Sequence, residues 1–242
     1  RAQTRQGVKK LFENKILHGF ETKRLTRDGR LLDIIIDGAV FYDENNQPAG
    51  QVITLRDVTP EKRMARVNEA LFRISKALYQ FRSLDDRLEF ITREVQALLA
   101  IEAALVILTD EEKNEFFFRA AAYDDAEAQK RYRETRLPLD KGVAGQVYRT
   151  GKPMIVHDYY NSPHFYHRVD EQTGFRTRDM VQVPIWSEDR MIGVLGAVNR
   201  KEGQFDTTDV ELLSAIAGIV ALPIENARIN EALQNSYEEV KS

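Results

Sequence analysis

Residues 158–177 read DYYNSPHFYHRVDEQTGFRT, an aromatic and polar stretch in the second half of the chain. A Gly-rich connection, LPLDKGVAGQVYRTGKP at 137–153, comes before it. The apolar runs MVQVPIW at 180–186 and MIGVLGAVN at 191–199 come after it, and both have the length and composition of strands. The quoted stretch therefore lies in a connection that leads into a sheet.

The surrounding sequence predicts helices at both ends of this sheet. The amphipathic run at 84–100 predicts a helix, and the runs AALVILTD at 103–110 and EFFFRAAAY at 115–123 predict strands joined by a short charged turn. A closing helix follows the cap-like DTTD at 206–209. We therefore expect residues 84–228 to form an α+β domain, a sheet with helices on its faces.

The first segment, residues 1–60, alternates short β-rich runs with turn signals. FETKRLTR at 20–27 and RLLDIIIDGAVFY at 30–42 flank Asp28-Gly29, a dipeptide that favours tight hairpin turns, and QVITLRDV follows at 51–58. Three antiparallel strands make only half of a typical small sheet and leave an apolar face with little to cover it. We expect something else to complete this sheet.

Two helical stretches, 61–83 and 212–242, have apolar residues spaced alternately three and four apart. The first series is Met64, Val67, Leu71, Ile74, Leu78 and Phe81. The second is Leu212, Ala215, Ile219, Leu222, Asn226, Ile229, Leu233, Ser236 and Val240. Such heptads predict coiled-coil seams and a parallel homodimer, with 229–242 as the start of an output coiled coil. The alternative for the first helix is packing on its own domain.

Pro223 lies inside the closing helix, where it removes one backbone hydrogen bond and should bend the helix. The bend is either a hinge or a kink that the surrounding packing tolerates.

Bulk composition argues against several classes of partner. Lys and Arg number 35 against 38 Asp and Glu, so no basic excess is available to bind nucleic acid. The absence of cysteine removes disulfides and thiol chemistry and fits a cytoplasmic protein. No apolar run approaches the roughly 20 residues of a membrane span. The chain opens on Arg1 and ends within a helical pattern, so we expect further segments on both sides.

Catalytic and metal motifs are missing from the sequence. It contains no Walker or dinucleotide-binding Gly loop, no HExxH, no GxSxG and no kinase signature. His164 and His167 have HxxH spacing, but no third ligand of suitable spacing accompanies them, so we interpret them as surface residues and expect no metal. The sequence therefore predicts a protein without catalytic machinery of its own.

The first segment resembles the C-terminal half of a PAS domain. The resemblance depends on RDGR at 27–30, the hydrophobic strand after it, DENNQPAG at 43–50, and the tetrapeptide Arg56-Asp57-Val58-Thr59, which is similar to the DIT-type motif before an output helix. It implies a partial PAS sheet at 1–60 followed by a signalling helix at 61–83. The first strands and pocket helices of a PAS domain are absent from this sequence, so no PAS ligand site is implied.

Residues 84–228 are similar to GAF domains, in particular those of cyclic nucleotide phosphodiesterases and bacterial adenylyl cyclases. The stretch 158–177 matches their DAY, F, VD and TGFRT elements with the spacing intact. Downstream residues resemble the NKFDE motif, with Val210 at the position of its final Glu. The matching residues are Asn199, Arg200 or Lys201, Phe205 and Asp209.

This resemblance implies a buried pocket for a purine cyclic nucleotide, cAMP or cGMP. Carried over by position, its residues are Tyr123, Asp124, Val143, Ala144, Tyr166, Asp170, Thr173 and Thr177. Two positions depart from the family, because Ala104 or Leu105 replaces a hydroxyl that touches the base and Gly196 replaces an acidic group.

The residue types suit such a ligand. Tyr123 or Tyr166 can stack on a purine, and the backbone N–H groups of 142–145 can receive the phosphate. Thr173 and Thr177 are four apart, so on a helical turn both hydroxyls would face the ligand. Alternatively these residues only hold the fold, with Asp170 capping a helix, Thr173 in a turn and the tyrosines in the core.

Two functions follow from these observations. The first is a non-catalytic regulatory module whose GAF domain binds a small ligand and relays a signal to an output domain outside this sequence. The alternative is a ligand-free structural relay or a protein-interaction domain. We interpret the NKFDE-like residues as structural in both cases, bracing the last strand against the closing helix.

Overall fold

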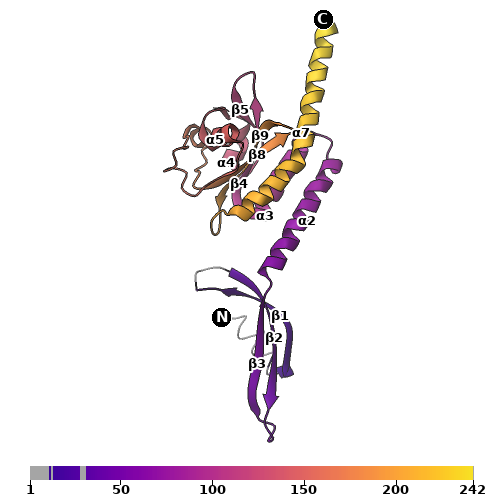
Figure 1. Cartoon of the computed structure of the whole chain (residues 1–242), viewed down its shortest axis with the longest axis vertical. Helices are drawn as coiled ribbons and strands as arrows, with labels where there is room; N and C mark the ends of the chain where they lie inside the picture. The colour runs from indigo at the N-terminus through magenta and orange to yellow at the C-terminus, as the bar shows by residue number, and fades with distance from the viewer. Residues whose placement is uncertain (1–10, 12, 28–30, 242) are drawn as a thin grey trace. The chain divides into compact units, whose positions relative to one another are not determined.

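The computed structural model describes residues 11, 13–27 and 31–241. The chain divides into two compact units, Arg1–Asn68 and Glu69–Ser242, and helix α2 (Thr59–Gln80) crosses the boundary (Figure 1).

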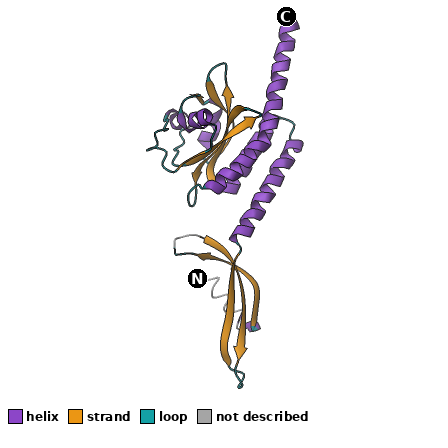
Figure 2. Cartoon of the chain, viewed as in Figure 1, coloured by secondary structure: helices purple, strands orange, loops and turns teal. Residues whose placement is uncertain are grey.

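The first unit contains a three-stranded antiparallel sheet of order β1-β2-β3 (Figure 2). Its strands are β1 (Ile16–Leu25), β2 (Leu31–Tyr42) and β3 (Pro48–Asp57). The predicted strands are therefore present. The predicted turn at Asp28-Gly29 lies outside the described residues, but β1 and β2 pair on either side of it, with Leu25 opposite Leu31.

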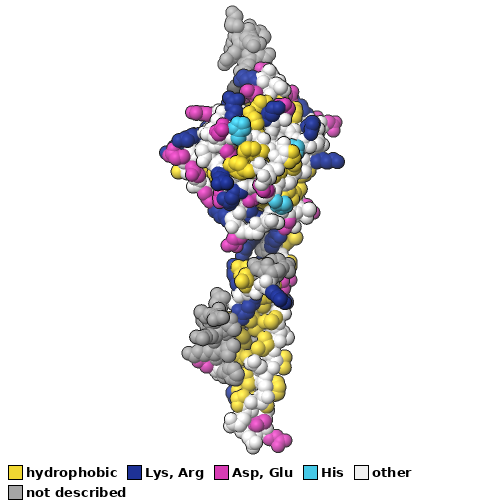
Figure 3. Space-filling model, turned by 90° about the vertical axis from the view of Figure 1, so that its left-hand side faces the viewer, with side chains coloured by type: hydrophobic (Ala, Val, Ile, Leu, Met, Phe, Trp, Pro, Cys, Tyr) yellow, Lys and Arg dark blue, Asp and Glu magenta, His cyan; other side chains and the backbone are white. Residues whose placement is uncertain are grey.

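Strand β3 is exposed on both faces, and hydrophobic side chains gather on the surface of this sheet (Figure 3). Val52, Ile53 and Leu55 are all exposed. A small cluster packs on the other strands and consists of Leu11, Leu17, Ile34 and Ile36. The sheet thus presents the uncovered apolar surface that the sequence predicts.

The second unit is built on a six-stranded antiparallel sheet of order β6-β5-β4-β9-β8-β7. Its strands are β4 (Ile101–Asp110), β5 (Glu115–Tyr123), β6 (Arg136–Pro138), β7 (Met154–Val156), β8 (Met180–Ser187) and β9 (Arg190–Arg200). Its helices are α3 (Leu84–Leu99), α4 (Ala126–Arg131), the 3₁₀ turn Tyr132–Glu134, α5 (Gly142–Thr150), α6 (Arg168–Thr173) and α7 (Thr207–Lys241).

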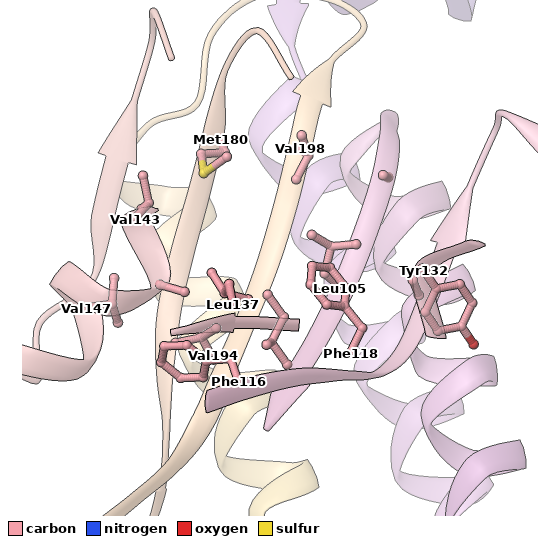
Figure 4. Packing of buried hydrophobic residues seen from close by; sticks show 14 of the residues in the cluster. Leu105, Phe116, Phe118, Tyr132, Leu137, Val143, Val147, Met180, Val194 and Val198 are labelled. Carbon is pink, nitrogen blue, oxygen red and sulfur yellow. The ribbon is translucent and has the colours of Figure 1, made fainter. Parts of the chain in front are cut away.

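Helices cover both faces of this sheet. α3 and α7 pack on one face, and α4 and α5 lie on the other (Figure 1). α6 packs against α4. The main core fills the space between the sheet and α5, where Phe116, Val143 and Met180 are among the packed side chains (Figure 4). The structure thus has the α+β architecture, a sheet with helices on its faces, that the sequence predicts.

Helix α3 shows how local sequence sets these elements. Its first turn is capped by Ser83, whose Oγ accepts a hydrogen bond from the backbone N–H of Asp86 at 3.1 Å. Leu88, Ile91 and Val95 recur at helical spacing and are fully buried. The helix ends where Ala100 adopts a left-handed conformation with φ of 50°.

The C-terminal half of α2, from Glu69 onward, belongs to the second unit and packs within it. Ala70, Ile74 and Ala77 are fully buried, and Arg73 Nε lies 2.8 Å from Glu94 Oε2 of α3. The alternative interpretation, that this helix packs on its own domain, therefore holds for its second half. Ile74 is buried within the chain and is not free to join a seam with a second copy.

Helix α7 is continuous through Pro223 and is apolar on two sides. One side is buried in the core and consists of Leu212, Leu213, Ile216, Ala217, Val220, Ala221 and Ile224. Leu212 was expected in the seam, so the free part of the predicted seam begins only after it. On the other side Leu222, Ile229 and Leu233 are 67%, 50% and 63% exposed.

By length and composition alone, the part of α7 from Thr207 to Leu233 could cross a membrane. The sequence was expected to hold no such run. A core helix of a soluble protein passes the same test, and 44% of the most apolar window is buried inside this unit.

Candidate functional site

A small cavity of about 40 Å³ lies between the sheet and helices α5 and α6. It is lined mainly by apolar side chains of β4, β5, β8 and β9, with a few polar groups from the segment after Tyr159. Seven of the eight residues predicted for the ligand site line it. They are Tyr123, Val143, Ala144, Tyr166, Asp170, Thr173 and Thr177.

The eighth predicted residue, Asp124, does not line the cavity. It is about half exposed, its Oδ2 lies 2.7 Å from Lys201 Nζ, and its Oδ1 accepts a hydrogen bond from Gln96 Nε2 at 3.0 Å. Adjacent residues of an extended chain point to opposite sides, so Asp124 points outward where Tyr123 points inward. The structure therefore does not bring Asp124 together with the other seven predicted residues.

Tyr123 forms part of the aromatic wall of the cavity. Its ring meets the Phe175 ring edge-to-face, with centroids 5.0 Å apart and planes at 72°. Burial raises the pKa of the Tyr123 hydroxyl well above its usual value, with a further contribution from the Asp170 charge. The phenol therefore stays neutral at physiological pH.

Asp170 holds the segment after α6 in place. Its carboxylate accepts hydrogen bonds from the Thr177 backbone N–H at 2.8 Å, the Thr177 hydroxyl at 2.7 Å and the Tyr160 hydroxyl at 3.0 Å. The alternative interpretation, in which Asp170 caps a helix, is wrong, because Asp170 lies within α6. Asp170 thus fixes the cavity wall through Thr177.

The predicted pairing of Thr173 and Thr177 on one helical turn is wrong. α6 ends at Thr173, because Gly174 takes a left-handed conformation with φ of 74°, and Thr177 lies on the segment beyond. The Thr173 hydroxyl donates to the Val169 carbonyl at 2.9 Å, and the Thr177 hydroxyl donates to Asp170. Since both hydrogens are used inside the protein, these hydroxyls are available to a ligand only as acceptors.

The start of α5 borders the cavity, with Gly142, Val143 and Ala144 in its lining. The first N–H groups of an α-helix have no intrahelical partner, so this turn suits an anion, as the resemblance implied. A Cβ at Gly145 would lie 2.6 Å from the carbonyl carbon of Asp140, so glycine is needed there for the helix to pack on the preceding chain.

Residues 82–225, more than half of the chain, match the family model for the GAF domain. The chain belongs to the GAF domain family. The match begins at residue 82, so the first unit lies outside it and the PAS resemblance stays a hypothesis.

This GAF domain is similar to part of a known protein. The "Probable 3',5'-cyclic phosphodiesterase pde-5" of Caenorhabditis elegans is 28% identical over 117 residues, which are 48% of this chain and 16% of that protein. The chain therefore spans only a small part of that relative.

Solved structures share the GAF fold. The GAF domain of a phosphoenolpyruvate-protein phosphotransferase from Coxiella burnetii has a TM-score of 0.63 at 19% identity, with 69% of this chain and 98% of that one covered. The free methionine-R-sulfoxide reductase from Neisseria meningitidis has a TM-score of 0.57 at 24% identity, covering 68% of this chain and 91% of that one. At these identities the likeness concerns the fold alone.

The NKFDE-like residues of this GAF domain are structural, as the sequence indicated. Arg200 forms the ion pair with Asp209 at the start of α7, and its guanidinium lies 5.7 Å from the centroid of the buried Phe205 ring. Lys201, the other candidate for this pair, contacts Asp124 instead. The motif therefore ties the last strand to the closing helix.

Asn199 of the same motif fixes the segment that follows α6. Its Oδ1 accepts a hydrogen bond from the Arg178 N–H at 2.7 Å, and its Nδ2 donates to the Arg176 carbonyl at 2.8 Å. Asp170 thus holds Thr177, and Asn199 holds its two neighbours, Arg176 and Arg178.

The lining residues of the GAF cavity that sequence reasoning missed include two polar side chains, Tyr159 and Gln182. The Tyr159 hydroxyl accepts from the Tyr166 N–H at 3.1 Å and donates to the Tyr166 carbonyl at 3.2 Å. Burial raises the pKa of Tyr159 to about 12, so it remains a donor. The signal for Gln182 was present, since it is the single amide within the apolar run MVQVPIW.

Proposed function

We propose that this chain is a non-catalytic sensory module of a signal transduction protein, in which the GAF domain binds a small ligand. The observation that supports this most is the cavity, which gathers seven of the eight residues expected from the ligand-binding members of the family. GAF domains as a family are regulatory and sensory modules, so a ligand-dependent relay agrees with membership.

The proposed ligand is a purine cyclic nucleotide, cAMP or cGMP. The cavity offers aromatic rings, uncharged hydroxyl and amide groups beside the Asp170 carboxylate, and the start of α5 for one phosphate. The relative in Caenorhabditis elegans is named as a cyclic phosphodiesterase, which favours the same class. Pockets for ligands of this size measure roughly 300–1,000 Å³, so the 40 Å³ cavity has to widen on binding.

Widening has a direct route to α7. Movement of Asp170 or Thr177 pulls on the segment that ends at Asp179, and Asp179 Oδ1 accepts a hydrogen bond from the Arg200 N–H at 2.9 Å. Arg200 in turn pairs with Asp209 at the start of α7. We infer that this chain of bonds relays ligand binding to the closing helix and the output segment at 229–242.

Calorimetric titration of the chain with cAMP and cGMP tests the proposed ligand. We expect micromolar or tighter binding of at least one nucleotide. Asp170→Ala should weaken it at least tenfold, because the cavity wall loses three hydrogen bonds from the Asp170 carboxylate.

Glu171→Ala is the matched control, since Glu171 is the exposed neighbour on α6 and should leave the affinity unchanged. Absence of both heat and a shift in Tm with either nucleotide would contradict the proposed ligand. That result would favour the second candidate, a ligand-free structural relay, for which the small cavity volume is the supporting observation.

We also propose a homodimer through helices 61–83 and 212–242, modified by the packing of Ile74 described above. Leu222, Ile229 and Leu233 form an exposed apolar series on α7 at coiled-coil spacing. Covering them with the same series of a second copy removes this apolar surface from water.

Leu222→Glu combined with Leu233→Glu should convert the dimer to a monomer at micromolar concentration, because charges would face each other across the seam. Light scattering measures the mass. Glu231→Gln changes an exposed charge two residues beyond Ile229, on the opposite side of α7, and should leave the dimer intact. A wild-type chain that is monomeric at this concentration would refute the dimer.

The wider context follows from composition and resemblance. We propose a cytoplasmic module, within a longer protein, whose first unit is the C-terminal half of a PAS domain. We expect no catalytic activity, no metal, no nucleic-acid partner and no membrane insertion. A net charge of −3, with acidic and basic side chains interspersed on the face of the GAF domain seen in Figure 3, supports the expectation about nucleic acid.

A further inference from the structure

Gln182 is a buried amide in an otherwise apolar strand. In β8, Val181, Val183 and Ile185 alternate with residues on the opposite face of the strand, and Met180 and Gln182 line the cavity. Gln182 is only 4% exposed. A polar side chain at such a position costs stability unless its groups are hydrogen-bonded.

The side chain of Gln182 lies across Gly196, its partner in the neighbouring strand β9. A Cβ added to Gly196 would be 3.3 Å from Gln182 Cγ and 3.5 Å from Nε2. The glycine, which stands where the resemblance predicted an acidic group, therefore provides the surface over which the amide rests. The polar group that the resemblance predicted at position 196 is missing, and the polar side chain of Gln182 lies over that position instead.

The Gln182 Oε1 atom is buried and has no hydrogen-bond partner. Several other polar side chains in the described part of the cavity wall are paired inside the protein. Asp170 accepts three hydrogen bonds, the Thr173 and Thr177 hydroxyls donate inside the protein, and the Tyr159 hydroxyl is bonded twice. An unpaired buried acceptor in a cavity wall is a place where a ligand donor gains a full hydrogen bond.

We propose that Gln182 is the specificity-determining residue of the cavity and that its Oε1 accepts a hydrogen bond from an N–H group on the flat ring of the ligand. The inference rests on the proposed function and names the part of the ligand that is recognised. Adenine offers an exocyclic amine, and guanine offers a ring N–H and an amine. A purine without either group would leave Oε1 unpaired.

The first test separates ligand recognition from a structural role by thermal unfolding. Gln182→Leu keeps a similar volume and removes the unpaired acceptor, so Tm should rise by about 3 °C. Gln129→Leu is the matched control, because Gln129 Nε2 donates to the Ala121 carbonyl at 3.1 Å and its Oε1 accepts from the Tyr123 N–H at 2.8 Å. That variant should lower Tm. A fall in Tm for Gln182→Leu would overturn the proposal.

The second test compares three nucleotides by calorimetry: cAMP, cGMP and the 3',5'-cyclic monophosphate of purine riboside, whose base carries no N–H. The wild-type chain should bind the third at least tenfold more weakly than its better natural counterpart. In Gln182→Leu this difference should vanish.

The outcomes are distinguishable. Equal binding of all three nucleotides to the wild-type chain would overturn the role of Gln182 and leave the proposed ligand class intact. If none of the three nucleotides binds, the proposed ligand class is overturned, and the assignment of a purine N–H to Gln182 is overturned with it.

Discussion

Replacing Asp209 with alanine is expected to lower the free energy of unfolding of the GAF domain by about 3 kcal/mol. The Asp209 carboxylate is fully buried, pairs with Arg200, and accepts a hydrogen bond from the Asp206 N–H at 2.9 Å. Removing one partner of a buried ion pair costs about 3–5 kcal/mol, since the other charge is left uncompensated. The Arg200 side chain is 20% exposed and keeps some hydration, which places the loss at the lower end.

Urea unfolding followed by fluorescence measures this loss selectively. The single tryptophan of the chain, Trp186, lies on β8 and therefore reports on the GAF domain. Asp206→Ala is the matched control. Asp206 caps the same helix, with its Oδ1 accepting from the Thr208 N–H at 2.8 Å, and losing a cap costs about 1 kcal/mol. Equal losses in the two variants would show that the buried pair contributes no more than a cap.

An alanine at Gly193 is expected to destabilise the GAF domain by about 3 kcal/mol or more. Gly193 pairs with Leu108 in the middle of the sheet, and a Cβ there would lie 2.2 Å from the Ile107 carbonyl oxygen. Overpacking usually costs about 1–3 kcal/mol, and more when the obstacle cannot move. Here the obstacle is backbone, which moves only if β4 and β9 separate.

Gly196→Ala on the same strand is the control for this prediction. Its Cβ would meet Gln182 Cγ at 3.3 Å, and a side chain can shift where backbone cannot, so the loss should stay below about 1 kcal/mol. Tryptophan fluorescence in urea measures both variants. A comparable loss at the two glycines would contradict the distinction between backbone and side-chain obstacles.

The long periodic elements of the second unit could be predicted from the sequence. The apolar runs of β4, β5, β8 and β9 and the amphipathic pattern of α3 appear where expected. The short elements α4, β6, α5, β7 and α6 were not predicted, because their three to nine residues lie in Gly-rich or polar connections and are stabilised by tertiary contacts.

The cavity residues were found through resemblance, and the errors have physical causes. The sequence spacing of Thr173 and Thr177 suggested one helix face, but Gly174 between them ends the helix. That signal was readable in advance, since glycine is the usual residue just after a helix. Asp124 follows Tyr123 at the end of a strand. Side chains of adjacent residues in an extended chain point to opposite sides, so only Tyr123 points into the cavity.

Heptad spacing left a different ambiguity. The same pattern at 61–83 serves for pairing with a second copy and for packing on a nearby helix of the same chain, and only the burial of Ile74 decides between them for that position. The unpaired state of Gln182 was likewise beyond prediction, because it depends on Gly196, fourteen residues away and on another strand.

The small cavity also has a kinetic consequence. A ligand larger than about 40 Å³ enters only after lining groups have moved apart. The two hydrogen bonds between Tyr159 and Tyr166, which both line the cavity, oppose such a movement. When such opening precedes binding, the observed association rate levels off at the opening rate as ligand concentration rises. The apparent Kd then exceeds the intrinsic Kd by the inverse of the open fraction, so a variant that loosens this contact would bind both faster and more tightly.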